Sequence, residues 1–193
     1  MDLKGKKIIL ASNSPRRKEL LAGLDICFEV DTRNNFEEVY DPSTPHEMIP
    51  EVLSEGKSYG FHRELADDEI LITSDTLVLC GDRVMGKPHS REEAFDMLRF
   101  LSGREHKVIT AITVRDQHQC RTSSDTAIVH FKELNDNEIW YYIDNYKPFD
   151  KAGAYGIQEW IEYIGIGRIE GSFFTIMGLP VHLVYKELLE FVA

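Results

Sequence analysis

Cysteine is scarce in this sequence: three of the 193 residues are Cys, and no two of them form a Cys-x-x-Cys pair. The wide spacing of Cys27, Cys80 and Cys120 argues against a structural zinc site, and their odd number favours reduced thiols in the cytoplasm. Each lies in or beside an apolar, strand-like run, so we expect all three to pack in the core.

Long hydrophobic runs are also missing. No apolar run approaches the roughly 20 residues that span a bilayer, and the charged first residues lead at once into a strand pattern instead of a signal peptide. We therefore expect a cytoplasmic protein with no membrane partner. The Gly-x-x-x-x-Gly-Lys-Ser/Thr loop is absent as well, which argues against a P-loop nucleotidase.

Positive charge is in the minority, because 22 Lys and Arg residues face 33 Asp and Glu residues, for a net charge of −11. The first 20 residues are the exception, since they hold six basic residues and only two acids. A basic pocket in an acidic protein suits a small anionic ligand. Long duplex DNA needs many phosphates neutralised at once, so we expect no nucleic-acid partner.

The remaining composition is that of a globular protein, with a hydrophobic fraction of 42%. No repeat, low-complexity segment or linker divides the chain, so residues 1–193 are expected to form a single domain, or two lobes around one core. Strand patterns cover residues 7–11, 26–30, 70–80, 107–115 and 126–131. Helix patterns cover residues 15–22, 45–59, 91–101, 136–144 and 181–191.

The alternation of these patterns predicts an α/β fold built on a central mixed sheet. The turn at residues 116–118 is typical of a hairpin, which makes the sheet partly antiparallel. Ser14, Ser90 and Asn135 are suited to cap the helices that follow them. Pro50 should kink the helix pattern at 45–59 or move its start to about residue 50.

The richest segment lies between the first strand and the first helix. Ser12 and Ser14 precede Pro15, which fits the first helical position, and Arg16 and Arg17 follow in the first turn. A helix N-terminus offers backbone N–H groups to an anion, and two Arg add bidentate donors for phosphate. The alternative is an ordinary capped helix with two solvated Arg.

Four further places carry candidate chemistry. Asp75 interrupts an apolar strand and needs a partner or a metal there, unless local N–H groups satisfy it at a bulge. Lys87, in a Gly-Lys-Pro turn, and Lys57, on a helix, could face an anion or simply solvent. Glu37 and Glu38 follow a polar loop, where paired acids are either a solvated surface or oxygen ligands for magnesium.

The last candidate is the segment from Asp150 to Gln158, whose two Gly and two Ala allow close backbone approach. The Gln158 amide carries a donor beside an acceptor, which matches the imide edge of uracil or thymine. The alternative interpretation of this segment is a plain tight turn that carries one polar residue.

Taken together, these motifs are similar to those of the Maf family of nucleoside triphosphate pyrophosphatases, also called septum formation inhibitors. The resemblance runs from about residue 7 to residue 190. It rests on Ser12-x-Ser14-Pro15-Arg16-Arg17, Ser74-Asp75-Thr76, Gly86-Lys87-Pro88, Leu101-Ser102-Gly103, Asp150-Lys151-Ala152-Gly153-Ala154-Tyr155-Gly156-Ile157-Gln158 and Gly171-Ser172…Gly178-Leu179-Pro180, in that order.

The resemblance implies an elongated, two-lobed α/β molecule with a twisted mixed sheet, flanking helices and an active cleft, as in the inosine triphosphate pyrophosphatases. It also implies hydrolysis of dTTP and UTP, and by extension of modified pyrimidine nucleotides, to the monophosphate and pyrophosphate. Ser74, Ser58 and Glu159 depart from the family, which more often has Ala, Ala and Gly at those positions.

Residue roles follow from the resemblance by motif. Asp75 matches the proton acceptor, and Glu38 matches an acid in the active cleft, with Glu37 as its alternative. Arg16, Thr76 and Gln158 match positions linked to substrate choice, while Ser12, Arg17, Lys57 and Lys87 match phosphate contacts. Asp75 and Glu38 would hold a divalent cation, Mg²⁺ or in its place Mn²⁺. Whether Asp75 takes the proton of the attacking water directly or holds that water through the metal stays open.

Three alternatives stay open. The 7-methyl-GTP branch of the same family is disfavoured by Gln158, and a non-catalytic regulator of cell division is disfavoured by Asp75, Lys87 and the two Arg. The oligomeric state is open between a monomer and a homodimer.

Overall fold

The computed structural model describes residues 2–192 and divides the chain into two compact units. The first unit holds the chain up to Asp75, residues Thr110–Asp125, and the chain from Gly178 onward. The second unit holds Thr76–Ile109 and Thr126–Met177. Strands β3 (Glu69–Cys80), β5 (Glu105–Arg115) and β6 (Cys120–Phe131) contribute residues to both units.

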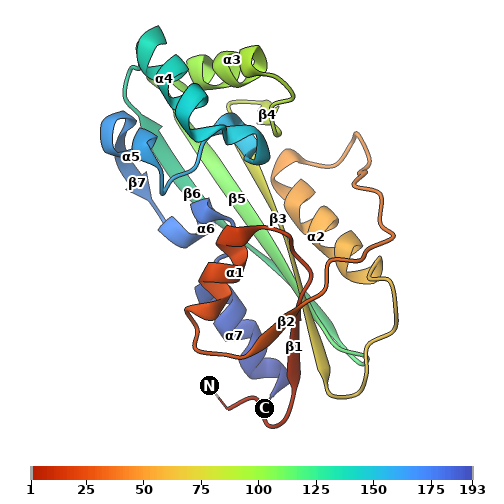
Figure 1. Cartoon of the computed structure of the whole chain (residues 1–193). Helices are drawn as coiled ribbons and strands as arrows, with labels where there is room; N and C mark the ends of the chain where they lie inside the picture. Colours follow the sequence, from red (N-terminus) through yellow and green to blue (C-terminus); the bar gives the residue numbers. More distant parts are fainter. Residues whose placement is uncertain (1, 193) are drawn as a thin grey trace. The chain divides into compact units, whose positions relative to one another are not determined.

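One sheet runs in the order β2-β1-β3-β5-β6-β7, with the short strand β4 paired to β3 (Figure 1). The pairs of β1 with β2 and with β3 are parallel, whereas β3–β4 and β6–β7 are antiparallel. The mixed α/β sheet with flanking helices predicted from the sequence is therefore confirmed.

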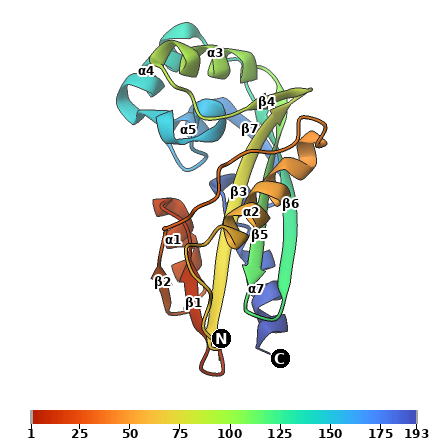
Figure 2. The same ribbon diagram turned by 90° about the vertical axis from the view of Figure 1, so that its right-hand side faces the viewer.

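In the first unit, β1 (Lys7–Leu10) lies between β2 (Phe28–Val30) and β3. Ile8, Ile9 and Leu10 are all buried, as expected of a parallel strand with neighbours on both sides. Helices α1 (Pro15–Ala22), α2 (Ile49–Tyr59) and α7 (Val181–Phe191) belong to this unit. The start of β1 and the end of α7 lie at the same end of it in both ribbon views (Figures 1 and 2).

The cap of α1 forms as the sequence predicts, whereas α2 and α7 begin without a side-chain cap. The Ser14 hydroxyl accepts a hydrogen bond from the Arg17 backbone N–H, and Pro15 begins α1. Of the two effects expected of Pro50, the moved helix start is confirmed, because α2 begins at Ile49, after a 3₁₀ turn over His46–Met48. Proline thus occupies the first turn, where its missing N–H costs no hydrogen bond.

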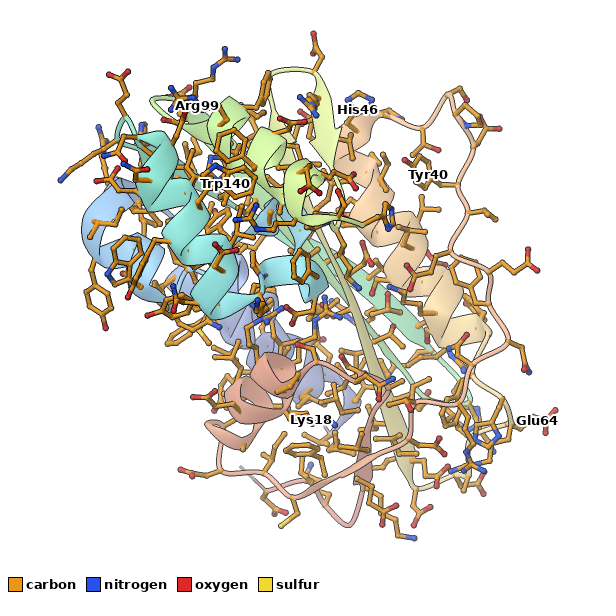
Figure 3. The ribbon with its side chains drawn as sticks, turned by 45° about the horizontal axis from the view of Figure 1, so that its top comes forward. Lys18, Tyr40, His46, Glu64, Arg99 and Trp140 are labelled. Atoms are coloured by element: carbon orange, nitrogen blue, oxygen red, sulfur yellow. The ribbon has the colours of Figure 1, made fainter. Side chains whose placement is uncertain are left out.

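The second unit contains β4 (Arg83–Met85), β7 (Ile166–Glu170) and helices α3 (Arg91–Leu101), α4 (Asp136–Tyr146), α5 (Trp160–Gly165) and α6 (Phe173–Met177). Short 3₁₀ turns cover Pro148–Asp150 and Ala152–Ala154. Helices α3 and α4 pack side by side (Figures 1 and 2). Trp140 of α4, which is labelled in Figure 3, stacks on Phe95 of α3 with ring centroids 4.3 Å apart. Asn135 begins α4 with a full capping box.

The structure differs from the sequence expectation at several places. Strand β6 begins at Cys120, not at residue 126, because its polar first half is paired by the hairpin to β5. The sequence patterns do not predict four short elements, β4, β7, α5 and α6. Each has six residues or fewer, which is too short to show a clear hydrophobic period. Cys80 is buried as expected, but Cys27 is exposed and Cys120 half-buried, so core packing of all three cysteines is wrong.

All three cysteines are free thiols in the structure. Among residues 2–192, none of the helices combines the length and apolar character that a membrane crossing requires.

Candidate active site

The centre of the candidate site in the first unit is Asp75, in the middle of β3. Its carboxylate receives a hydrogen bond from the Lys57 ammonium, with 2.6 Å between Nζ and Oδ1. Both side chains are largely buried, at 14% and 18% exposure. Of the alternatives that the sequence left open, the structure shows an ion pair, which offsets the cost of burying each charge alone.

Lys57 contacts a second carboxylate. Its Nζ lies 3.0 Å from Oε1 of Glu38, in the segment between β2 and α2. The structure thus brings together Asp75, Lys57 and Glu38, and of the two acids that the sequence could not separate it places Glu38 against Lys57. The ammonium lies between two acids, so Lys57 belongs to the cluster and is not a solvated surface lysine.

Two glycines, Gly56 in α2 and Gly60 directly after the helix, hold the segment that carries Glu38. A Cβ added to Gly56 would lie 2.3 Å from Cζ of Phe36, and one added to Gly60 would lie 2.4 Å from Cβ of Phe36. The Phe36 ring therefore rests where the helix has no side chains. Asn34 donates through its amide to the Lys57 carbonyl at 2.6 Å and accepts from the Phe36 N–H at 2.8 Å.

These contacts were not predicted from the sequence. The available signal was a pair of glycines four residues apart, one inside the helix pattern and one directly after it, because that spacing leaves one face of a helix without side chains. Nothing in the sequence indicates that Phe36 fills the space.

The N-terminus of α1 is built from short-range contacts. The Ser12 hydroxyl, which is buried, accepts from the Ser14 N–H at 3.2 Å, and the Ser14 hydroxyl accepts from the Arg17 N–H. Arg16 lies in the same first turn and is half-exposed. The helix start expected from the sequence is therefore present, while contacts from Ser12 and Arg16 to phosphate stay predictions.

Arg17 ties three segments of the first unit together. Its Nε donates to the Gly178 carbonyl and a terminal nitrogen donates to the Ser74 carbonyl, each at 2.8 Å. The Ser74 hydroxyl also donates to Gly178, at 3.2 Å. Burial lowers the pKa of Arg17, and the charge of Asp75 opposes that shift. Arg17 thus fixes the strand residue immediately before Asp75.

The remaining predicted residues belong to the second unit. Thr76 follows Asp75 in β3. Lys87 is exposed, in the turn after β4, and the Gly86 carbonyl before it accepts from the Gly153 N–H at 3.0 Å. This bond joins the Lys87 turn to the segment that leads to Gln158.

Gln158 has one unusual atom. Its side-chain Oε1 is buried and has no hydrogen-bond partner among the described residues 2–192. Orphaned buried acceptors cost free energy, so such an atom indicates a donor that the protein itself does not supply.

A family model described as "Maf-like protein" matches residues 7–191. The chain belongs to the Maf family. The family resemblance expected from the sequence is therefore confirmed over nearly the whole chain.

Curated relatives agree with this membership. A protein of Porphyromonas gingivalis strain W83 is 48% identical over 192 residues, covering 98% of this chain and 96% of its own length. One from Parabacteroides distasonis is 50% identical over 190 residues, covering 98% of each. Both are named dTTP/UTP pyrophosphatase. A solved HAM1 protein from Coxiella burnetii, 13% identical, covers 65% of this chain and 73% of its own with a TM-score of 0.41, which is too low to support an argument.

The donor set of this Maf chain can be tested against the divalent cation that the family resemblance implies. No group of three or more His, Cys, Asp or Glu side chains suited to a metal occurs within residues 2–192. Asp75 and Glu38 nevertheless converge on one cation, the Lys57 ammonium. Two carboxylates fit Mg²⁺, which is commonly held by one or two carboxylates together with substrate phosphates and water.

Proposed function

We propose that this Maf protein hydrolyses dTTP and UTP, and modified pyrimidine triphosphates, between the α and β phosphorus atoms to give the monophosphate and pyrophosphate. The observation that carries the proposal is the cluster of Asp75, Lys57 and Glu38, in which the first two are largely buried and Glu38 is exposed, in a chain whose relatives at 48% and 50% identity are named dTTP/UTP pyrophosphatase. Burying a charge in an apolar strand costs free energy, so Asp75 at the middle of β3 is a candidate for a functional role.

Asp75 is assigned the role of proton acceptor. Asp75 lies 2.6 Å from the Lys57 ammonium, and a carboxylate held in one place by such a contact can take a proton from an attacking water. Arg17 holds the Ser74 carbonyl and so fixes the backbone that orients Asp75. Fixed orientation matters because general-base catalysis requires hydrogen-bond reach to the water.

We assign the neutralisation of the phosphate charge to four basic side chains, Arg16, Arg17, Lys57 and Lys87, and a hydroxyl contact to Ser12. Lys57 can move from its two acids to a phosphate without leaving a group unpaired, provided that a cation replaces it between Asp75 and Glu38. These two residues would hold Mg²⁺ or Mn²⁺. Such an ion supplies charge neutralisation for the phosphoanhydride.

Base recognition is assigned to Gln158, with Arg16 and Thr76 contributing to substrate choice. The orphaned Oε1 of Gln158 can accept the N3–H of uracil or thymine, and its amide N–H can donate to a neighbouring base carbonyl. Cytosine offers an acceptor at N3 and so leaves Oε1 unpaired. This supports dTTP and UTP over CTP, and it gives 7-methyl-GTP no advantage.

Location and assembly complete the proposal. Three free cysteines are consistent with the reducing cytoplasm, where we place the protein. A homodimer is retained as the assembly to test beside the monomer. We also propose that the activity is enzymatic and not that of a non-catalytic regulator of cell division.

The test is a substrate panel. Purified protein is incubated with Mg²⁺ and each of dTTP, UTP, CTP, ATP, GTP and 7-methyl-GTP, and pyrophosphate and orthophosphate are measured separately. We expect pyrophosphate from dTTP and UTP, with at least about tenfold lower kcat/KM for the others. Orthophosphate as the first product would contradict cleavage at the α–β bond, and preference for 7-methyl-GTP would contradict the assignment of Gln158.

A further inference from the structure

The turn that presents Gln158 is held by a buried polar network in the second unit. The Gly156 N–H donates to the Tyr142 hydroxyl at 2.9 Å, and that hydroxyl donates to Oε2 of Glu159. The other carboxylate oxygen, Oε1, lies 3.1 Å from the Lys151 ammonium. Glu159 therefore uses one oxygen for a neutral donor and the other for a cation.

The network is shielded from water. Tyr142 is fully buried, the Lys151 side chain is 9% exposed and Glu159 is 17% exposed. Burial, followed by the hydrogen bond to Glu159, raises the pKa of Tyr142, so its hydroxyl remains a donor. Hydrogen bonds to a charged acceptor at low dielectric are among the stronger ones in proteins.

The same side chains pack directly on the turn. A Cβ on Gly156 would lie 2.9 Å from Cδ of Glu159 and 3.0 Å from Cε of Lys151, so the carboxylate and the lysine stem fill the space beside the backbone. The Glu159 N–H also donates to the Gly156 carbonyl at 3.1 Å. The turn from Gly156 to Glu159 is thus fixed at both ends.

Gln158 lies inside this turn. Its Oε1 is buried and has no hydrogen-bond partner within residues 2–192. An amide can face a base in two orientations, one that suits uracil and one that suits cytosine. Rotation about the last side-chain torsion interchanges these orientations, whereas the backbone of the turn sets where either one presents its donor and acceptor. Selection of a base therefore also depends on how firmly the backbone around Gln158 is held.

We propose that Glu159 is a positioning residue for base selection, which acts by locking the turn that carries Gln158 through Tyr142 and Lys151. The inference rests on the proposed function and adds to it the group that makes Gln158 selective.

The experiment compares Glu159→Gln, Glu159→Gly and Tyr142→Phe with the unaltered protein, using kcat and KM for UTP and CTP. We expect the ratio of kcat/KM for UTP to that for CTP to fall about tenfold, mainly through a higher KM for UTP, while kcat changes by less than about threefold. Tyr142→Phe removes a single oxygen and keeps the packing, so it tests the lock even if a Glu159 variant fails to fold.

The matched control is Glu187→Gln, which neutralises another buried carboxylate, paired with Arg121 at 2.5 Å in the first unit. It should lower the melting temperature without changing the UTP to CTP ratio. An unchanged ratio in Tyr142→Phe and in the folded Glu159 variants would overturn the inference, and so would a ratio that falls equally in the control. If the unaltered protein does not hydrolyse UTP, the proposed function fails instead, and UMP binding by calorimetry then tests the lock.

Discussion

At the scale of single residues, Asp75 was identifiable because a carboxylate interrupts an apolar strand. Its partner was not, since Lys57 lies on another element and its sequence neighbourhood is that of a surface helix. The structure supplies the missing fact, a 2.6 Å contact between two largely buried side chains. Sequence patterns show that a group needs a partner, but only the fold shows which one it obtains.

Asp75→Asn tests the assigned proton acceptor. Asparagine keeps the shape but loses both the basicity and the negative charge, so we expect kcat to fall by about a hundredfold or more. The substitution also leaves Lys57 with Glu38 alone, so the melting temperature must be measured in parallel. Turnover above about a tenth of the unaltered protein, in a folded variant, would contradict the role of a general base.

At the scale of elements, five strands and five helices were predictable, and the caps account for much of that success. Ser14, Ser90 and Asn135 each accept the backbone N–H that the cap rule assigns to them. The short elements β4, β7, α5 and α6 have too few residues to show a hydrophobic period. Three to six residues span less than two helical turns, or at most three apolar–polar alternations of a strand.

The contact between α2 and the segment of Glu38 leads to a prediction at this scale. Gly56→Ala should favour the isolated helix by about 1 kcal/mol, since glycine is a poor helix former. The new Cβ would lie 2.3 Å from the Phe36 ring and must displace it, together with the segment that brings Glu38 to Lys57. We therefore expect kcat/KM for UTP to fall about tenfold or more.

The control for that substitution is Glu55→Ala, at an exposed position of the same helix, which should leave kcat/KM within about twofold. A double-mutant cycle with Phe36→Ala sharpens the result. If Gly56→Ala and Phe36→Ala act through one contact, their effects are not additive. Additive losses, or full activity in Gly56→Ala, would show that Phe36 does not position Glu38.

At the scale of the whole molecule, the sequence indicated the fold class, the family and the chemistry, but not the arrangement that links them. The three members of the charged cluster come from the segment before α2, from α2 and from β3. Their approach depends on packing of Phe36 against two glycines, and such packing has no periodic signature. The network that holds the turn of Gln158 could not be predicted either, because in the sequence pattern Tyr142 is an ordinary apolar position of a helix.

The acid sensitivity of folding gives the last prediction, and it follows from one buried histidine. His106 is 2% exposed, its Nε2 lies 2.7 Å from the Tyr155 hydroxyl, and its Nδ1 has no partner among residues 2–192. Burial, with a smaller effect of His130, lowers the pKa of His106 from its usual 6.5 to about 3. The ring is neutral in the folded protein, in contact with Phe131 and Tyr155.

Between pH 6.5 and pH 3 the His106 ring binds a proton in the unfolded chain but not in the folded chain. The free energy of unfolding must therefore fall as the pH falls through this window. At pH 5 the loss from this one group is about 2 kcal/mol relative to pH 7. Urea unfolding at pH 7 and at pH 5 should therefore show a smaller loss of unfolding free energy in His106→Gln than in the unaltered protein. The glutamine cannot titrate, but it can still form a hydrogen bond with Tyr155. The control is His118→Gln at an exposed turn position, which changes the histidine count equally and should keep the full loss. Equal pH dependence in His106→Gln and the unaltered protein would show that other groups govern acid unfolding.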